Sequence, residues 1–240
     1  MVSSAVRRAQ WALHRRAALA CTAAAEAGVP GRFRVWEEAG LMAVLATDPA
    51  LGFLSTVSGV GPETVAAAVE LARGPVWDGV RPTVVTASGD LTGAGLARTN
   101  DRVLAVTELV GRPEPDPGVV GTEAFADVVL AGYEVDGVLA AFVRAEHRHP
   151  AVRRFVLVTA GTPIAAAGMT VHGDVAVFGG ASTLRAHRGR GAQSRLLRHR
   201  LGVAADAGCV LAVATAAPDS VSARNLSGAG FRLHRMSAWR

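Results

Sequence analysis

A stretch rich in glycine and arginine, residues 187–197, has the residue types and spacing to bind a phosphate group. It reads His-Arg-Gly-Arg-Gly-Ala-Gln-Ser-Arg-Leu-Leu. Gly189 and Gly191 lack a Cβ, so a ligand can approach the backbone closely there. A helix that begins just after them would present unpaired N–H groups and a partial positive charge, to which Arg188 and Arg190 add formal charge. The stretch therefore predicts a turn that binds a phosphate or pyrophosphate.

The segments on either side are those that such a turn requires. Residues 175–184 before it are apolar and strand-like. Residues 194–207 after it carry four apolar side chains on one face at helical spacing, Leu196, Leu197, Leu201 and Ala204. Residues 209–215 predict a buried parallel strand, and a loop, a helix that ends near residues 228–230 and a last strand follow. The predicted order is strand, phosphate turn, helix, strand, helix, strand.

From about residue 120 onward, this pattern resembles the GCN5-related N-acetyltransferase (GNAT) superfamily. The acyl-CoA loop of that family has Arg or Gln, two residues, Gly, one residue, then Gly or Ala. Arg188 and Gly191 match it, Gly189 flanks it, and Gln193 replaces the last glycine. A bacterial branch with the form RGRGAQ has a later Ser-x-x-Asn…Gly-Phe element, which is reproduced here by Ser222, Asn225, Gly230 and Phe231. The resemblance implies an α/β fold of the α+β type with a mixed sheet, and acetyl-CoA or another acyl-CoA as co-substrate.

The resemblance also implies a set of cofactor-binding residues. In the family, backbone N–H groups of the strand before the loop hold pantetheine and polarise the thioester, and a polar side chain of the later helix contacts the cofactor. Together with the loop, the corresponding positions are Ala181, Ser182, Thr183, Leu184, Arg188, Gly189, Arg190, Gly191, Ala192, Gln193, Ser194 and Asn225.

The sequence indicates the residues that transfer protons less clearly than those that bind the cofactor. The family often places a tyrosine four residues before the glycine of the Gly-Phe pair to protonate the departing thiolate, but Leu226 stands there. Ser222, Ser227 or water is then left as the donor, and Ser222 is our candidate. Four side chains are available as the base that deprotonates the amine: Asp174, which is our candidate, His172, Glu134 and His147. The only tyrosine, Tyr133, is expected to pack in the core.

These observations favour an N-acetyltransferase that moves an acetyl group from acetyl-CoA to an amine of a small molecule or peptide, directly in a ternary complex. The alternative is a non-catalytic acyl-CoA sensor or partner subunit, which the missing tyrosine suggests. The formal net charge of +5 raises a third class, a protein that binds RNA or DNA. However, the arginines are scattered and aromatic residues are few, so no nucleic acid partner is expected.

The composition restricts the other classes. Half of the 240 residues are hydrophobic, which is ample for a core, and Cys21 and Cys209 stand alone, so no disulfide is expected. His147 and His149 lack a third ligand, so no metal is expected. No apolar run has the length of a membrane span, and the basic start lacks the apolar core of a signal peptide. We expect a cytoplasmic protein without membrane partners, and a homodimer is allowed for.

The N-terminal half repeats the element order found around the loop. Residues 62–73 are a predicted helix, and Gly59-Val-Gly-Pro-Glu63 stands at its start, where the C-terminal half has the phosphate turn. Glu63 and the absence of arginines make this segment a poor pyrophosphate site. We infer a degenerate GNAT-like N-terminal domain, residues 1–118, that supplies walls to an acceptor pocket, and a catalytic GNAT domain, residues 119–240. The proline-rich residues 111–119 are the predicted linker. The other elements predicted in this half are helices over 5–27 and 90–98 and strands over 33–36, 41–47, 51–57, 82–86 and 103–110.

Overall fold

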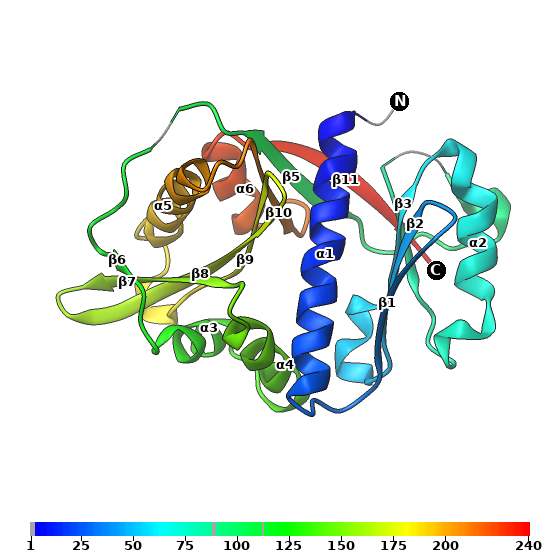
Figure 1. Cartoon of the computed structure of the whole chain (residues 1–240), viewed down its shortest axis with the longest axis horizontal. Helices are drawn as coiled ribbons and strands as arrows, with labels where there is room; N and C mark the ends of the chain where they lie inside the picture. Colours follow the sequence, from blue (N-terminus) through cyan, green and yellow to red (C-terminus); the bar gives the residue numbers. More distant parts are fainter. Residues whose placement is uncertain (1–2, 88–89, 112) are drawn as a thin grey trace.

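The structure is a computed structural model that describes residues 3–87, 90–111 and 113–240 (Figure 1). These residues form a mixed sheet of eleven strands in the order β1-β2-β3-β4-β11-β5-β10-β9-β8-β7-β6. The mixed α/β class that the sequence predicts is therefore confirmed. One end of the sheet comes mainly from the N-terminal half and the other mainly from the C-terminal half.

The N-terminal half combines α-helices with short strands. They are α1 (Ser4–Glu26), β1 (Phe33–Glu38), β2 (Leu41–Ala46), β3 (Thr56–Val60), α2 (Val65–Arg73), β4 (Thr83–Thr86) and β5 (Arg102–Glu108). The C-terminal half comprises β6 (Val119–Val120), α3 (Phe125–Tyr133), α4 (Gly137–Arg148), β7 (Arg153–Thr159), β8 (Thr162–His172), β9 (Val175–Thr183), α5 (Ala192–Asp206), β10 (Leu211–Ala216), α6 (Val221–Gly228) and β11 (Arg232–Trp239).

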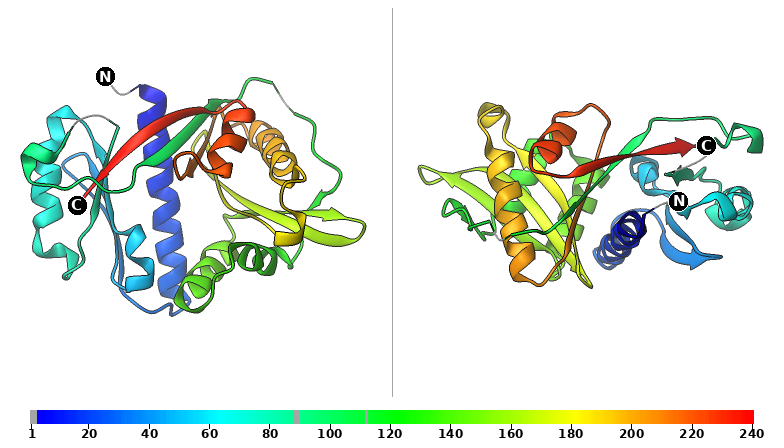
Figure 2. Two further views of the ribbon diagram at one scale, coloured as in Figure 1. Left: turned by 180° about the vertical axis from the view of Figure 1, so that it is seen from behind. Right: turned by 90° about the horizontal axis from the view of Figure 1, so that it is seen from above.

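Helices cover both faces of the C-terminal part of the sheet. Apolar side chains of α5 and α6 pack on one face, around Leu196 and Leu226. The opposite face is covered by α1, α3 and α4, which lie on the other side of β8 and β9 in Figures 1 and 2. The site-bearing strand β9 is thus fixed from both sides.

Helix α1 lies between the two halves of the molecule. Its small side chains allow close packing, because Val6, Ala9 and Ala12 are buried against β5, β9 and β10. Farther along, Ala20 and Ala24 are buried against the start of the N-terminal sheet and α4. The helix begins at a capping residue, Ser3, whose Oγ accepts a hydrogen bond of 3.3 Å from the Val6 N–H.

The two halves exchange strands, as Figure 2 shows. Strand β5 of the N-terminal half lies between β10 and β11 and is antiparallel to both. Strand β11 pairs with β5 over Arg232–Met236 and then with β4 over Ser237–Trp239. Each half therefore completes the sheet of the other. The division into domains at residues 118 and 119 stays a prediction.

Two of the predicted elements are wrong. Residues 51–54 belong to a 3-10 helix, Pro49–Leu54, not to a strand, because Pro49 starts a tight turn and Asp48 Oδ1 accepts from the Ala50 N–H at 2.9 Å. In the predicted helix over 90–98, only Thr92–Ala94 form a 3-10 turn. Gly95 ends that turn with a φ of +74°.

The predicted linker is held against α5. Its residue 112 lies outside the described residues. The Asp116 carboxylate accepts two hydrogen bonds from the Arg195 guanidinium, at 2.7 Å from Nε and 2.6 Å from Nη2. The Asp116 N–H donates to His199 Nδ1 at 3.1 Å. The Arg195 guanidinium lowers the pKa of Asp116 from 3.8 to about 2.

We expect Asp116→Asn to lower the free energy of unfolding by about 1 kcal/mol at pH 7, a value reduced for the partial exposure of Arg195. A carboxyl whose pKa is lowered by folding stabilises the protein above its unfolded pKa. This contribution is therefore lost between about pH 4 and pH 2. Urea unfolding as a function of pH measures it. Asp127→Asn, which removes the exposed pair with Arg144, is the control and should change stability by less than about 0.5 kcal/mol.

Candidate active site

The two central parallel strands of the C-terminal half separate from each other to form a fork. β9 and β10 pair at Val175–Leu211, Ala176–Ala212 and Val177–Val213. Beyond Val177, β9 continues to Thr183 and β10 to Ala216, and no further pairing between them occurs in the described part of the chain. Backbone groups on the inner edge of β9 are therefore free to bind an extended ligand.

The phosphate turn lies at the open end of this fork. Gly191 is the N-cap residue of α5 with a φ of +75°, and Gly189 has the same φ. No side chain caps α5, whereas the neighbouring α6 is capped by Ser220 Oγ, which accepts from the Ala223 N–H at 3.1 Å. The first N–H groups of α5 are thus left for an anion, as the sequence predicts.

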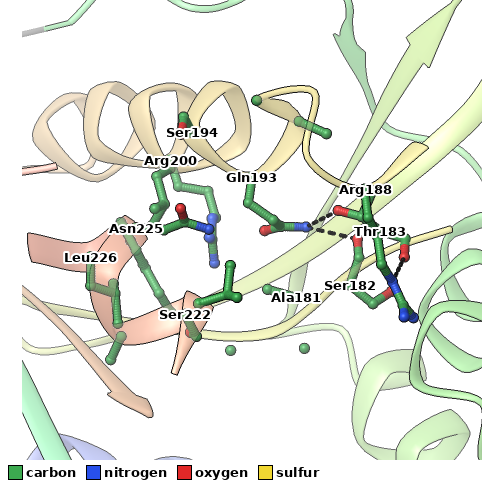
Figure 3. Close-up of a pocket in the computed structure, with 18 of the residues that line it drawn as sticks. Ala181, Ser182, Thr183, Arg188, Gln193, Ser194, Arg200, Ser222, Asn225 and Leu226 are labelled. Atoms are coloured by element: carbon green, nitrogen blue, oxygen red, sulfur yellow. Dashed lines mark hydrogen bonds between the residues drawn. The ribbon is translucent and has the colours of Figure 1, made fainter. Parts of the chain in front are cut away.

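Two side chains of the turn hold it against β9 (Figure 3). Gln193 Nε2 donates to the Ser182 carbonyl at 2.7 Å and to Thr183 Oγ1 at 3.0 Å. The side chain of Arg188, which the sequence places beside the predicted phosphate site, is directed toward α3. Its guanidinium donates to the Gly132 carbonyl at 2.8 Å and pairs with Glu134 at 3.1 Å. Gln193 and Arg188 therefore fix the turn to β9 and α3.

A cavity of about 800 Å³ extends from the turn into the fork. Most of the residues predicted from the sequence line it: Ala181, Ser182, Thr183, Arg188, Gly189, Gly191, Ala192, Gln193, Ser194, Ser222 and Asn225. Leu184 packs instead against α3, and Arg190 is exposed outside the cavity lining. The structure thus brings the strand, the turn and α6 together around one space.

The structure does not bring the candidate base Asp174 to the cavity. Asp174 precedes β9, at the end remote from the turn, and pairs with Arg8 at 2.6 Å on the surface. His172 ends β8 at the same remote end of the sheet, and Glu134 binds Arg188. Position therefore argues against Asp174 as the group that accepts a proton from the acceptor amine.

A bulge in β9 faces the base of the fork. Gly179 pairs with Gly168 and Ser182 with Ala166, so two residues of β9 oppose Ala167 alone. Gly180 in this bulge has a φ of +58°. A Cβ at Gly180 would overlap the imidazole of His147, and one at Gly179 would lie 2.9 Å from the guanidinium of Arg16. A Cβ therefore does not fit at Gly180, and at Gly179 it would require the Arg16 guanidinium to shift.

A buried charged cluster supports the bulge from the face covered by α1. Arg16 Nη2 lies 2.7 Å from Glu146 Oε1, and Arg16 Nη1 donates to the Val177 carbonyl at 3.2 Å. Burial is the largest influence on the pKa of Glu146 and raises it, but the charge of Arg16, that of His147 and the hydrogen bond from Arg16 together outweigh it, so that pKa is lowered overall. Burial lowers the pKa of His147. Because its Nδ1 is 2.7 Å from the Val143 carbonyl, Nδ1 carries the proton of the neutral ring and the buried Nε2 has no partner.

The sequence analysis missed two candidate functional residues that line the cavity. Tyr133, at the end of α3, lines the cavity and does not pack in the core. Burial and the Glu146 carboxylate raise the pKa of its hydroxyl, while the charge of Arg16 and a backbone hydrogen bond with Ala181 lower it less. Arg200 of α5 also lines the cavity although it is only 1% exposed. Neither residue has a local motif, so spacing alone could not have identified them.

The cavity lining is positive. Arg188 and Arg200 line it, and no Asp or Glu does among the described residues. Burial lowers the pKa of Arg200 to about 9, so this side chain remains a cation at neutral pH. Within the same described ranges, no three His, Cys, Asp or Glu side chains are grouped to hold a metal ion. The site is suited to an extended anionic ligand.

A forked parallel pair, an uncapped helix N-terminus and a positive cavity match the class of protein that the sequence resembles, the GNAT acetyltransferases. Comparison with known families agrees with this class. Residues 123–231 match the family model described as acetyltransferase (GNAT) family, so the chain carries a GNAT acetyltransferase domain over these residues. The family resemblance that the sequence suggested is thereby confirmed.

Solved structures share the fold over nearly the whole chain. A GCN5-related N-acetyltransferase from Kribbella flavida is 21% identical, with a TM-score of 0.58 over 93% of each chain. A GCN5-related N-acetyltransferase from Sphaerobacter thermophilus is 15% identical, with a TM-score of 0.54 over 86% of this chain and 74% of that one.

A tandem GNAT protein from the clavulanic acid biosynthesis pathway is 16% identical, with a TM-score of 0.51 over 92% of this chain and 86% of that one. No match was found among curated proteins. Among the described helices, none has the length and apolar character needed to cross a membrane.

Proposed function

We propose that the protein transfers an acetyl group from acetyl-CoA to an amine of a small molecule or peptide, directly within a ternary complex. The observation that carries this proposal is the fork, whose inner β9 edge is unpaired immediately in front of the uncapped N-terminus of α5. A fork closed by strand pairing could not admit the pantetheine arm. In the N-terminal half, the equivalent pair β3–β4 stays closed up to Val60–Thr86.

The cofactor side of the reaction is assigned to the turn and β9. N–H groups of residues 191–194 would bind the pyrophosphate, and the inner edge of β9 at Ala181, Ser182 and Thr183 would hold the pantetheine arm and so orient the thioester farther along the fork. Asn225 and Ser222 of α6 face the same space from the other side (Figure 3). The acetyl-CoA supplies the acyl group, and the chain supplies its position and the charge around it.

The acceptor side is assigned to a second cavity, of about 310 Å³, on the face of the sheet covered by α1. Residues of the N-terminal half, including Val44, Thr56 and Val85, form its far wall, and Thr215 of β10 lines both cavities. The amine would reach the thioester through the fork near Thr215. This placement supports the inference that the degenerate half supplies walls to an acceptor pocket.

We assign the proton donor for the departing thiolate to Tyr133. Because burial raises its pKa, the hydroxyl stays protonated at physiological pH and can donate. This tyrosine comes from α3, whereas the family position in α6 is occupied by the buried Leu226. Ser222, the donor that the sequence suggested, remains the alternative.

We expect Tyr133→Phe to lower kcat by about 10- to 100-fold, because the general acid is lost, and to leave the affinity for acetyl-CoA within about threefold. Release of free thiol at saturating acetyl-CoA measures the rate, and calorimetry measures the affinity. Ser222→Ala is the matched control and should retain nearly full kcat. The reverse pattern would assign the proton to Ser222.

The proposal itself is tested by calorimetric binding of acetyl-CoA, followed by thiol release with a panel of amines. Absence of binding would contradict it. One observation favours the non-catalytic sensor as a second candidate: in the described part of the chain no Asp or Glu lines either the cofactor cavity or the acceptor cavity, so no carboxylate is placed to act as the base. Binding of acetyl-CoA without thiol release for any amine, in wild type, would favour the sensor.

A further inference from the structure

Arg200 is a buried cation that lacks a carboxylate partner. It is 1% exposed, and no Asp or Glu oxygen of the described residues lies within 4.0 Å of it. A buried charge is strongly unfavourable unless it is paired. The other buried arginine near the fork, Arg16, follows this rule through its contact with Glu146. The partner of Arg200 is thus missing from the described residues.

The hydrogen bonds of Arg200 leave part of its guanidinium free. Nε donates to the Leu196 carbonyl and Nη1 to the Gly168 carbonyl, both at 3.2 Å. The guanidinium carbon lies 4.6 Å from the centre of the Phe178 ring. Nη2 has no acceptor among the described residues. In Figure 3, the guanidinium points from α5 into the space between Gln193 and Asn225.

Arg200 lies at the inner end of the cavity, remote from the phosphate turn. Phe178, on which it stacks, directly follows Val177, the last residue of β9 that pairs with β10. Thr183, next to the turn, is five residues farther along β9, roughly 16 Å away at the rise of a strand. A chain bound along β9 from the turn would carry its reactive end toward Phe178 and Arg200.

The charges around the inner end do not balance. Arg16 and Arg200 are cations, Glu146 is the one carboxylate with which either pairs in the described ranges, and Tyr133 is neutral. The positive charge of Arg16 also disfavours the charged form of Arg200. One negative charge on a bound reactant would compensate the excess and give Nη2 an acceptor.

We propose that Arg200 binds a carboxylate that a reactant carries to the inner end of the cavity. This inference rests on the proposed function, because it places the carboxylate next to the thioester. Two reactants could supply it: a dicarboxylic acyl group on CoA, of the malonyl or succinyl class, or an acceptor amino acid. The position of Arg200 favours the acyl group, because α5 lies on the sheet face opposite the α1-covered cavity assigned to the acceptor.

The experiment compares CoA, acetyl-CoA and succinyl-CoA by calorimetry in wild type, Arg200→Met and Arg198→Met. Arg198 is exposed on the same helix and is the matched control. If the acyl group carries the carboxylate, wild type binds succinyl-CoA about 10- to 100-fold more tightly than acetyl-CoA, the range of a hydrogen bond to a charged group. Arg200→Met loses that preference and keeps its affinity for CoA, and Arg198→Met changes neither.

A second arm tests the acceptor as the source. With acetyl-CoA as donor, Arg200→Met raises KM for amino acids about 10- to 100-fold, but not KM for the same amines without the carboxyl group. Arg200→Lys keeps the charge but not the planar guanidinium, so it should keep part of either preference. This variant serves as the test if Arg200→Met fails to fold.

Three results would overturn the inference. They are no preference for a carboxylate in either arm, an Arg200→Met variant that weakens CoA, acetyl-CoA and succinyl-CoA equally, and a folded Arg200→Lys variant that keeps no part of the carboxylate preference. The failure of the proposed function is distinct, because in that case CoA itself does not bind wild type.

Discussion

Replacing Gly191 with glutamate is expected to abolish binding of CoA and acetyl-CoA. The new carboxylate would lie at the N-terminus of α5, where it can accept hydrogen bonds from the N–H groups that the pyrophosphate needs. Its repulsion of a phosphate about 4 Å away is about 4 kcal/mol near a protein surface, which corresponds to a loss of roughly 1,000-fold. Calorimetry with CoA measures the loss.

Gly208→Glu is the matched control for this variant. Gly208 has a φ of +76°, almost equal to the +75° of Gly191, and a Cβ meets no atom within 4 Å at either position. Both variants therefore carry the same backbone strain of about 1–2 kcal/mol. Gly208 lies beyond the other end of α5, so its variant should bind CoA normally. A folded Gly191→Glu protein that binds CoA within a few-fold of wild type would show that the turn is not the pyrophosphate site.

Replacing Gly180 with alanine is expected to destabilise the protein and to impair the site together. The φ of +58° disfavours any residue with a Cβ, by about 1–2 kcal/mol. The new Cβ would also overlap the His147 imidazole, and overpacking of this kind costs about 1–3 kcal/mol more. Denaturant unfolding should therefore show a loss of about 2–5 kcal/mol. The displaced bulge should also weaken acetyl-CoA binding.

Two further variants separate the strain from the overlap. Gly161 has a φ of +77°, and a Cβ added there meets no atom within 4 Å. Gly161→Ala should therefore show only the loss of stability that comes from the backbone strain. The double variant Gly180→Ala/His147→Ala removes the ring that the methyl group meets, so the two changes should be less destabilising together than their sum. Strictly additive effects would mean that His147 does not restrict position 180.

The parts of the site that the sequence predicts correctly are local in the chain. The turn, the strand before it and the helix after it span residues 175–207, and glycine spacing with apolar periodicity is enough to define them. Ser222 and Asn225 follow from one further motif, and the structure places both at the same cavity. Arg188 was predicted to bind the cofactor and it lines the cavity, but the orientation of its side chain depends on Glu134 and Gly132, more than 50 positions away.

The parts that the sequence could not give depend on contacts between distant segments. Tyr133 reaches the cavity because Gly132 lets the end of α3 lie directly on Ser182. Arg16 and Glu146 meet across 130 positions, and nothing near either residue indicates the partner. The prediction for residues 51–54 failed for a local reason: the strands predicted over 41–47 and 51–57 leave residues 48–50 as a turn, whereas Asp48 caps a 3-10 helix that begins at Pro49.

The strand exchange also determines when each half can finish folding during synthesis. The edge of β4 that will hold Ser237–Trp239 stays without its partner until the last residues of β11 have left the ribosome. β5, in turn, has no sheet to enter until β10 exists, about 100 positions later. Neither half can therefore be a finished intermediate, and these edges stay open in nascent chains until β11 has been synthesised.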